Sequence, residues 1–328
     1  MDSNKVNVLG WYNHGNIGDE SYKLSFPLVL RQNLEFIDKL SNSRDICILG
    51  GGDVLDGYFL KQITHAKTKL ALSVSLSPNI KKETLDLFDL ICVRDTASYN
   101  IAKNKGKSVL HYPDFAFSLT SNKENGINLL NKMFTDNSID NYDKKIGIVI
   151  NSHLLPLINS PAYEVALFNM FCHELAHIMD TTSASFVFIP FGKAMPNDDI
   201  ISNGLVASKC KFWKKNLLIK DNLSVQETLD VISACDIMIS TRLHASIFSC
   251  ISEVPFIDIT HNHKNNALLE DLSYPHSISY WEFSKKSLEN LINIVTTKQQ
   301  EIKEKLHTIS SENKNKLQEL KPNVHFLQ

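Results

Sequence analysis

Short apolar runs alternate with amphipathic stretches twice along this chain, and this double alternation limits the fold more than any other feature. Five runs in the first half are apolar enough to be buried strands: Lys5–Gly10, Asp45–Leu49, Lys69–Ser75, Leu90–Val93 and Ser108–His111. The segments between them have the length of crossover helices. Strands of this kind, buried on both faces, predict a parallel sheet with helices on each side.

The same pattern restarts at residue 145. Five further strands are predicted at Lys145–Ile150, Ser185–Pro190, Asn216–Ile219, Asp236–Ser240 and Pro255–Ile259. Helices are expected between and after them, near Tyr163–Asp180, Asp199–Ser208, Ser224–Ala234 and His244–Ile251. Ser224 followed three residues later by Glu227 forms a capping box, which supports a helix start there. The second half therefore predicts a second parallel sheet.

The length of 328 residues agrees with two domains, because single cores usually stop growing at about 250 residues. We predict an N-terminal Rossmann-like domain over 1–121, a polar linker over 122–144 with one short helix, a C-terminal Rossmann-like domain over 145–283 and a helical tail over 284–328. The expected fold class is α/β, with two facing doubly wound domains. Ligands are expected at the carboxyl ends of the strands.

Composition excludes several classes of protein. The net charge of -2 argues against a nucleic-acid binder, which normally carries a basic surface. No window approaches the roughly 18 apolar residues of a membrane span, and no basic and apolar leader opens the chain, so we expect a cytoplasmic protein without an integral membrane segment. The six cysteines are scattered without a CxxC pair and are expected to be buried, reduced thiols.

Arginine is scarce. Only Arg31, Arg44, Arg94 and Arg242 occur among 34 basic residues. A planar guanidinium binds carboxylate or phosphate oxygens in pairs, which an ammonium does not. Each arginine is therefore a candidate anion ligand, and the alternative is that a lysine-rich chain keeps a few arginines by chance.

Glycines mark two turns of the first domain. Gly15, Asn16 and Gly18 lie where the first predicted strand leads into a helix, so backbone amides there can approach an anion or an acceptor. Asp19 follows them and either caps that helix or takes a proton from a sugar hydroxyl. The pattern is neither a dinucleotide fingerprint nor a phosphate-binding loop.

A second glycine run, ending in Gly51 and Gly52, precedes Asp53 after the next predicted strand. Such a run means that the backbone passes close to either a ligand or a neighbouring loop, and Asp53 is a candidate to bind an acceptor hydroxyl. Arg94 ends the strand Leu90–Val93 and either binds an anion or makes a surface contact or ion pair. Asp114, after a strand and a proline, is either a turn residue or a site residue.

The densest group of candidates is the turn Thr-Arg-Leu-His of the second domain. Arg242, Leu243 and His244 lie between a buried strand and a helix, where helix amides and an arginine can bind an anion beside an imidazole that donates a proton. Lys264 follows the next strand and returns to the same edge. His261 and His263 in that loop are interpreted as solvated polar residues.

One motif suggests a metal site but is assigned another role. His173, Glu174 and His177 have the spacing of a zinc protease helix. No third ligand follows at the usual spacing, and the helix fills a crossover between two predicted strands. We therefore interpret these residues as a solvent-facing helix stripe and predict no metal site.

Together these motifs carry a resemblance. GNIGDE, LGGGDVL, VRDTAS, YPDFAFSL and, most specifically, STRLHASIFSCISEVPFIDITHNHK resemble the polysaccharide pyruvyl transferase family over roughly residues 5 to 272. Trp11 and His14 depart from the family's usual small or aromatic residues, and HNHK replaces a tyrosine-containing loop. These departures bear on the acceptor rather than on the reaction.

The resemblance implies a glycosyltransferase-B-like fold of two facing Rossmann-like domains. It also implies an enzyme that uses phosphoenolpyruvate as donor and a sugar or glycan as acceptor, forms a cyclic pyruvate ketal and releases phosphate. It implies donor binding by Arg242, acid catalysis by His244, a basic contact from Lys264 and a carboxylate role for Asp19, and Arg94 is a weaker match to a donor-binding position. No cofactor is expected. Peripheral contact with a lipid-linked acceptor stays open, and so do two other functions: a glycosyltransferase using a nucleotide sugar, and a non-catalytic protein that binds sugars or anions.

Overall fold

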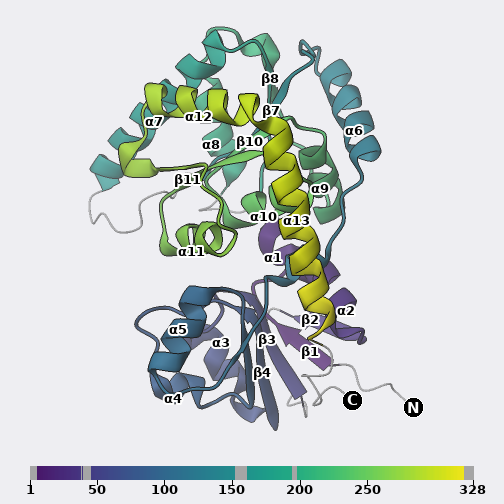
Figure 1. Cartoon of the computed structure of the whole chain (residues 1–328), viewed down its shortest axis with the longest axis vertical. Coiled ribbons are helices and arrows are strands. Elements are labelled where there is room, and N and C mark those ends of the chain that lie inside the picture. The colour runs from purple at the N-terminus through teal and green to yellow at the C-terminus, as the bar shows by residue number, and fades with distance from the viewer. Residues whose placement is uncertain (1–5, 38, 40–45, 152–160, 194–197, 321–328) are drawn as a thin grey trace. The chain divides into compact units, whose positions relative to one another are not determined.

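The computed structural model describes residues 6–37, 39, 46–151, 161–193 and 198–320 and contains two parallel six-stranded sheets (Figure 1). Its contacts divide the chain into two compact units: a first unit of residues 1–119, 270–272 and 311–328, and a second unit of residues 120–269 and 273–310. The α/β fold class predicted from the sequence is confirmed, and each sheet has the strand order of a doubly wound domain.

The first sheet has the order β2-β1-β3-β4-β5-β6, and all of its strand pairs are parallel. Its strands are β1 (Val6–Leu9), β2 (Leu34–Ile37), β3 (Ile46–Gly52), β4 (Thr68–Val74), β5 (Leu90–Val93) and β6 (Leu110–His111). The strand order reverses between β1 and β3, so the loops after these two strands lie at the switch point where such sheets bind ligands. Lys5 and Asp45, the first residues of two predicted strands, lie outside the described residues.

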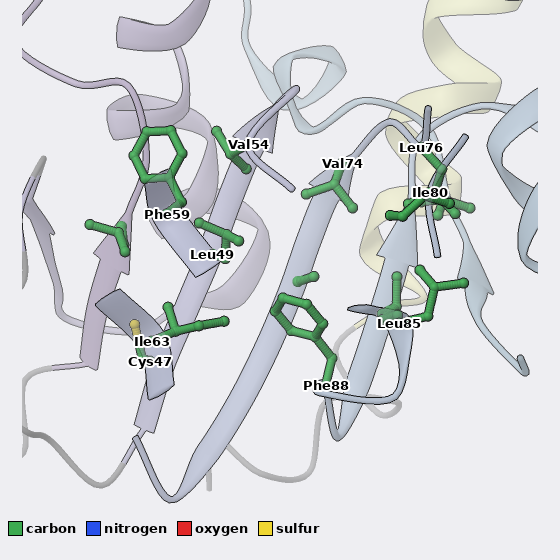
Figure 2. Packing of buried hydrophobic residues seen from close by; sticks show 14 of the residues in the cluster. Cys47, Leu49, Val54, Phe59, Ile63, Val74, Leu76, Ile80, Leu85 and Phe88 are labelled. Carbon is green, nitrogen blue, oxygen red and sulfur yellow. The ribbon is translucent and has the colours of Figure 1, made fainter. Parts of the chain in front are cut away.

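Helices cover both faces of this sheet. They are α1 (Ile17–Glu20), α2 (Tyr22–Leu30), α3 (Gly57–Gln62), α4 (Lys82–Leu85) and α5 (Thr96–Asn104), with short 3₁₀ turns η1 (Ile63–His65) and η2 (Phe115–Ser118). On one face, Phe59, Ile63, Leu85 and Phe88 pack against apolar side chains of β3 and β4 (Figure 2). Each large apolar side chain buried in this way contributes about 1.5–3 kcal/mol.

The second sheet has the order β12-β11-β10-β7-β8-β9, again with all pairs parallel. Its strands are β7 (Lys145–Val149), β8 (Ser185–Phe188), β9 (Asn216–Leu218), β10 (Ile237–Ser240), β11 (Phe256–Thr260) and β12 (Ser277–Ser279). The switch point lies between β7 and β10. The loop that follows β10 carries Arg242 and His244, so the fold places these residues where doubly wound sheets bind ligands.

The chain after residue 120 is rich in helices, many of which the sequence predicted. They are α6 (Lys123–Asp136), α7 (Pro161–Thr181), α8 (Asp199–Ala207), α9 (Val225–Ser233), α10 (Leu243–Ile251), α11 (His263–Asp271), α12 (Lys285–Thr297) and α13 (Gln299–Gln318), with 3₁₀ turns η3 (Trp213–Lys215) and η4 (Tyr280–Glu282). The ends of α11 and α13 belong to the first unit. The capping box of Ser224 and Glu227 opens α9 as predicted. The tail, predicted as one helix or two, contains α12 and α13.

The segment predicted as a linker contains α6, which packs on α9. The Asp230 carboxylate of α9 accepts hydrogen bonds from the Asn122 amide at 2.7 Å and from Asn125 Nδ2 at 2.7 Å. Gly126 lies so close to the Asp230 carbonyl that a Cβ there would overlap it. These contacts attach α6 to the second unit.

The helix α7 carries the zinc-like motif on its exposed side, as the interpretation of a solvent-facing stripe requires. His173, Glu174 and His177 are all exposed. Glu174 Oε2 accepts the backbone amide of Lys285 at 2.9 Å, and Lys285 Nζ lies 3.3 Å from His177 Nε2. The glutamate therefore satisfies an amide in the first turn of α12.

The cysteines test the prediction of buried, reduced thiols. Five of the six cysteines are buried, and burial raises the pKa of each of these five to about 12, but Cys210 is only partly buried. The prediction of buried thiols is therefore correct except at Cys210.

None of the helices in the described part of the chain has the length and apolar character needed to cross a bilayer.

Candidate functional site

The turn after β10 is held rigidly in the second unit. The Arg242 amide donates to Ser240 Oγ at 2.9 Å, and Thr241 Oγ1 accepts the Asn151 amide at 2.8 Å. Arg242 is the N-cap residue of α10, with an extended backbone conformation. The turn therefore places Arg242, Leu243 and His244 together at the carboxyl edge of the sheet, and all three are partly buried.

The Arg242 guanidinium is oriented by a carboxylate that the sequence analysis did not single out. Arg242 Nε lies 2.9 Å from Asp199 Oδ2, and Nη2 lies 2.5 Å from Oδ1. Asp199 Oδ2 also accepts the amides of Phe191 and Gly192, each at 2.9 Å. Burial raises the pKa of this fully buried carboxyl, and the Arg242 guanidinium opposes that shift. Asp199 thus fixes the direction of the guanidinium and joins it to the loop after β8.

The first turn of α10 differs from those of two neighbouring helices. Asp198 caps α8 through its side chain, and Asn262 Oδ1 accepts the amides of Lys264 and Asn265 at the start of α11. The N-cap of α10 is Arg242, whose side chain has no acceptor and makes no capping bond. The positive end of this helix dipole therefore lies beside a guanidinium, an arrangement that favours an anion.

Asp258 connects the two helices that carry the basic candidates. It lies on β11, is fully buried, and accepts hydrogen bonds from Ser246 Oγ of α10 at 2.6 Å and from Asn265 Nδ2 of α11 at 2.9 Å. An aspartate inside the otherwise apolar strand FIDIT is a signal in the sequence, because a carboxylate is rarely buried without a hydrogen-bonding partner. Through this carboxyl group, α10 with His244 and α11 with Lys264 keep a fixed relation to the sheet.

The stability of the Asp258→Asn variant relative to the natural protein is expected to rise by about 2 kcal/mol between pH 4 and pH 8. Burial raises the pKa of Asp258 from 3.8 to about 6. The folded protein therefore binds this proton more tightly than the unfolded chain, and that stabilisation is lost as the pH rises through 6. Asparagine has no proton to lose. Urea unfolding at both pH values measures the difference, with the exposed Asp221→Asn as the control, and an unchanged difference would contradict the prediction.

The loop after β11 adds two imidazoles to this edge. His261 is partly buried, and burial lowers its pKa, with Arg242 and Lys264 acting in the same direction because both positive charges are near. The interpretation of His261 as a solvated loop residue is therefore wrong, because the loop folds back onto the sheet edge. His263 is exposed, as expected.

In the first unit, the turn after β1 is built around Asn16. Asn16 is the N-cap of α1: its Oδ1 accepts the Gly18 amide at 3.1 Å and its Nδ2 donates to Asp19 Oδ2 at 2.6 Å. Asp19 therefore does not cap the helix itself. Gly15 has a φ of 70°, the left-handed conformation that favours glycine. A Cβ added at Gly52 would lie 3.2 Å from Asp19 Oδ1, which brings this turn and the end of β3 together.

The glycines of β3 are required by close neighbours in the same unit. A Cβ at Gly50 would lie 2.6 Å from the Phe26 ring, and a Cβ at Gly51 would overlap the Tyr22 ring. Gly51 and Gly52 also have φ values of 77° and 85°. At Gly50 and Gly51 the close approach is therefore to α2. Asp53 follows in an exposed position.

Arg94 lies in a buried network at the carboxyl edge of the first sheet. Its Nη1 contacts Asp114 Oδ2 at 2.9 Å and the Tyr22 hydroxyl at 2.8 Å, and its Nε donates to Ser75 Oγ at 2.8 Å. The side chains of Arg94 and Asp114 are 5% and 3% exposed. Of the two roles considered for Arg94, the structure shows the ion pair. Asp114 also accepts the Ala116 amide at 2.9 Å and so serves as a turn residue.

A comparison with family models decides which proteins this chain is related to. The model described as polysaccharide pyruvyl transferase matches residues 6–263, a range that contains Asp19, Arg242 and His244. The chain belongs to the polysaccharide pyruvyl transferase family. It is accordingly an enzyme of a transferase family that acts on sugar or glycan acceptors. The family resemblance inferred from the sequence motifs is thereby confirmed. A search of curated proteins found no match.

Solved structures show how the fold of this pyruvyl transferase family member compares with those of other proteins. MnaA of S. aureus, solved with UDP, superposes with a TM-score of 0.58 at 11% identity, covering 94% of this chain and 91% of that one. HepE of Anabaena, solved with UDP-glucose, gives a TM-score of 0.56 at 10% identity, with coverage of 97% and 98%. At such identities the likeness concerns the fold alone, and it confirms the predicted glycosyltransferase-B class.

Proposed function

We propose that this chain transfers the pyruvyl group of phosphoenolpyruvate to two hydroxyls of a sugar or glycan, forming a cyclic ketal and releasing phosphate. The observation that carries the proposal is the Arg242 guanidinium, held in two hydrogen bonds by Asp199 at the start of a helix whose N-cap side chain accepts no hydrogen bond. Family membership supports the class of reaction.

The donor has two anionic groups, a carboxylate and a phosphate, and the edge of the second sheet offers matching cations. We assign one anionic group to Arg242 and the first-turn amides of α10, which begins at Leu243. We assign the other to Lys264 in the first turn of α11. Lys264 follows β11, which pairs in parallel with β10, so it returns to the sheet edge that carries Arg242. No cofactor or metal takes part in this scheme.

The chemistry requires a proton donor beside the donor substrate. His244 protonates C3 of the enol, so that the CH₂ group becomes a methyl group and C2 becomes electrophilic. One acceptor hydroxyl then adds to C2 and loses its proton, and the second hydroxyl displaces phosphate and closes the ketal. One hydroxyl proton replaces the proton taken from His244, and the other leaves with phosphate. General acid catalysis of this kind contributes about 10²–10⁴-fold.

The acceptor hydroxyls are assigned to carboxylates of the first unit. Asp19 is partly buried next to Gly52 and is oriented by Asn16, and Asp53 is exposed after β3. We propose that Asp19 acts as the base for a hydroxyl and that Asp53 helps to bind the acceptor. Arg94 is left out of the donor site in this scheme, because its guanidinium is committed to Asp114.

Replacing His244 with alanine is expected to lower the rate of phosphate release by about a hundredfold or more, because the proton donor is lost. Phosphate is measured during incubation with phosphoenolpyruvate and a panel of β-galactosides and N-acetylhexosamine carriers. His263→Ala is the matched control, since it removes an exposed imidazole from the next loop of the same edge, and it should keep the full rate.

The same measurements separate this reaction from its rivals. Undiminished release by His244→Ala, or no release by the natural protein across the panel, would count against pyruvyl transfer. Thermal stabilisation by uridine diphosphate but not by phosphoenolpyruvate would favour a glycosyltransferase. Binding of phosphoenolpyruvate and sugar without product would indicate a non-catalytic binding protein.

A further inference from the structure

A concave site lies in the second unit, away from the residues discussed so far. A depression of about 520 Å³ is lined by residues that precede β7, β8 and β9, so it lies at the amino edge of the sheet, whereas Arg242 follows the carboxyl end of β10. Its volume is within the range of about 300–1,000 Å³ that small-molecule sites occupy. Its most conspicuous lining residues are aromatic: Tyr142, Phe212 and Trp213.

These aromatic side chains are unusually exposed. Phe212 is 61% exposed and Trp213 is 59% exposed, although the two are adjacent in the chain and large enough to be buried in a core. Tyr142 is 40% exposed. Two neighbouring aromatic residues left in water lose the free energy that burial would contribute, and exposed clusters of this kind often mark a binding surface.

The loop that carries them is anchored, so the aromatic rings are presented by a fixed backbone. Asp180 Oδ1 accepts the amides of Lys211 at 2.9 Å and Phe212 at 3.1 Å. Lys215 Nζ donates to the carbonyls of Thr182 at 2.8 Å and Asp180 at 3.3 Å. The Asp140 amide donates to the Lys214 carbonyl at 2.7 Å. A site held in this way loses little conformational entropy when a ligand binds.

The chemistry of the lining matches a sugar that carries a carboxylate. Flat aromatic rings pack against the apolar faces of sugar rings. The Thr181 and Thr182 hydroxyls donate to carbonyls of α7, so their oxygens can accept hydrogen bonds from sugar hydroxyls, and Ser183 adds a third hydroxyl to the lining. Asp180 and Lys215 are occupied by the contacts that anchor the loop. The exposed charges are therefore Lys211 and Lys214 against Asp140, an excess of one positive charge.

The shape of the site weighs against a lipid surface as the ligand, because a flat membrane would not fill a concave depression. Asp143, exposed beside Tyr142, offsets the one excess positive charge of the lining, so no broad basic surface is present to attract anionic headgroups. A carboxylate on a glycan, by contrast, can reach a single lysine.

We propose that this depression is a second glycan site, separate from the catalytic edge, that binds a sugar bearing a pyruvate ketal. The inference rests on the proposed function, because the ketal is the product of that reaction and gives each modified sugar a carboxylate. A site that binds modified repeats would keep a growing acidic glycan on the enzyme while further repeats are processed. Phe212 and Trp213 form the platform, and Lys214 or Lys211 pairs with the carboxylate.

The test uses fluorine NMR of the full chain labelled with fluorotryptophan. The chain has only three tryptophans, Trp11, Trp213 and Trp281, so the spectrum is simple. The Trp213 signal is assigned with Trp213→Phe. The pyruvate ketal of methyl β-galactoside is expected to shift this signal saturably, whereas unmodified methyl β-galactoside should shift it far less. The Trp281 signal, from another exposed tryptophan of the same unit, should stay in place.

Variants at the depression make the assignment specific. Lys214→Gln is expected to weaken binding of the ketal glycoside by about fivefold, the value of one exposed charge pair, while Lys220→Gln, an exposed lysine outside the depression, should not. Phe212→Ala should weaken binding of both glycosides. Phosphate release from a short acceptor should be unchanged in all three.

Several results would overturn the proposal. They are the absence of a saturable Trp213 shift, an equal shift by the unmodified galactoside, or a shift caused only by phosphatidylglycerol vesicles or only by uridine diphosphate. The titration needs no turnover. A failure of the glycan site and a failure of pyruvyl transfer therefore give different results, the first in the NMR signal and the second in phosphate release.

Discussion

Exchanging Arg242 for lysine is expected to lower kcat/KM for phosphoenolpyruvate by about a hundredfold. Lysine keeps the positive charge, so the loss would come from geometry. The guanidinium bonds both oxygens of Asp199 with Nε and Nη2, which fixes its plane at the start of α10. A single ammonium cannot hold both Asp199 oxygens and also present a fixed donor to the substrate. Phosphate release at varied phosphoenolpyruvate concentration measures the effect.

Two further variants separate donor binding from folding. Arg31→Lys makes the same exchange at an exposed position and should leave kcat/KM unchanged. Asp199→Asn keeps the size of the side chain but removes the charge that orients Arg242, so it should reduce kcat/KM in the same direction. Urea unfolding of each variant shows how much stability is lost. If Arg242→Lys folds normally and keeps kcat/KM within a few fold, the assignment of Arg242 to the donor is wrong.

The sequence predicted the apolar strands of both sheets and missed two short edge strands. The missed strands are β2 (Leu34–Ile37), in which every residue is only partly buried, and β12 (Ser277–Ser279). The first is partly buried throughout and the second has only three residues, so their apolar signals are weak, whereas the other two edge strands, β6 and β9, were predicted. The inner strands are buried along nearly their whole length, as in β10. Their continuous apolar runs made them visible from sequence alone.

The candidate site shows a different limit. Arg242 and His244 could be proposed because they follow a strand directly, and strand-to-helix turns have a known place in doubly wound folds. Asp199 could not, since 43 residues separate it from Arg242 and no local pattern connects the two. Its only local signal is a second acid beside the N-cap Asp198 at a predicted helix start. Which distant loops meet depends on the order of the strands within the sheet. The sequence pattern predicts where each strand lies along the chain but not that order.

The two arginines next to strand ends illustrate how the surroundings decide a role. Arg94 and Arg242 each follow a strand and each pair with an aspartate. Arg94 also donates to Tyr22 and Ser75, and its side chain is 5% exposed. Arg242 lies at the start of a helix without a side-chain cap, and its side chain is 13% exposed. The first set of contacts fits a structural ion pair, and the second fits a ligand site.

Replacing Asp114 with alanine is expected to destabilise the first unit by about 3–5 kcal/mol, because it leaves the Arg94 guanidinium buried without its counter-charge. Tyr22 also loses the acceptor of its hydroxyl, and the Ala116 amide loses its cap. Urea unfolding, followed by the fluorescence of Trp11 with Trp213 and Trp281 changed to phenylalanine, reports on this unit.

A double-mutant cycle tests whether Arg94 stabilises the fold by pairing with Asp114 or instead binds the donor substrate. Arg94→Met alone should cost a similar amount, because it leaves the Asp114 carboxylate unpaired, and the double variant should cost about 2 kcal/mol less than the sum of the two. Asp86→Ala is the matched control: it breaks an exposed ion pair with Lys107 at 3.6 Å and should cost at most about 1 kcal/mol. Additive costs would show that the pair is not coupled. A folded Asp114→Ala variant with an unchanged KM for phosphoenolpyruvate, beside a raised KM in Arg94→Met, would return Arg94 to the donor site.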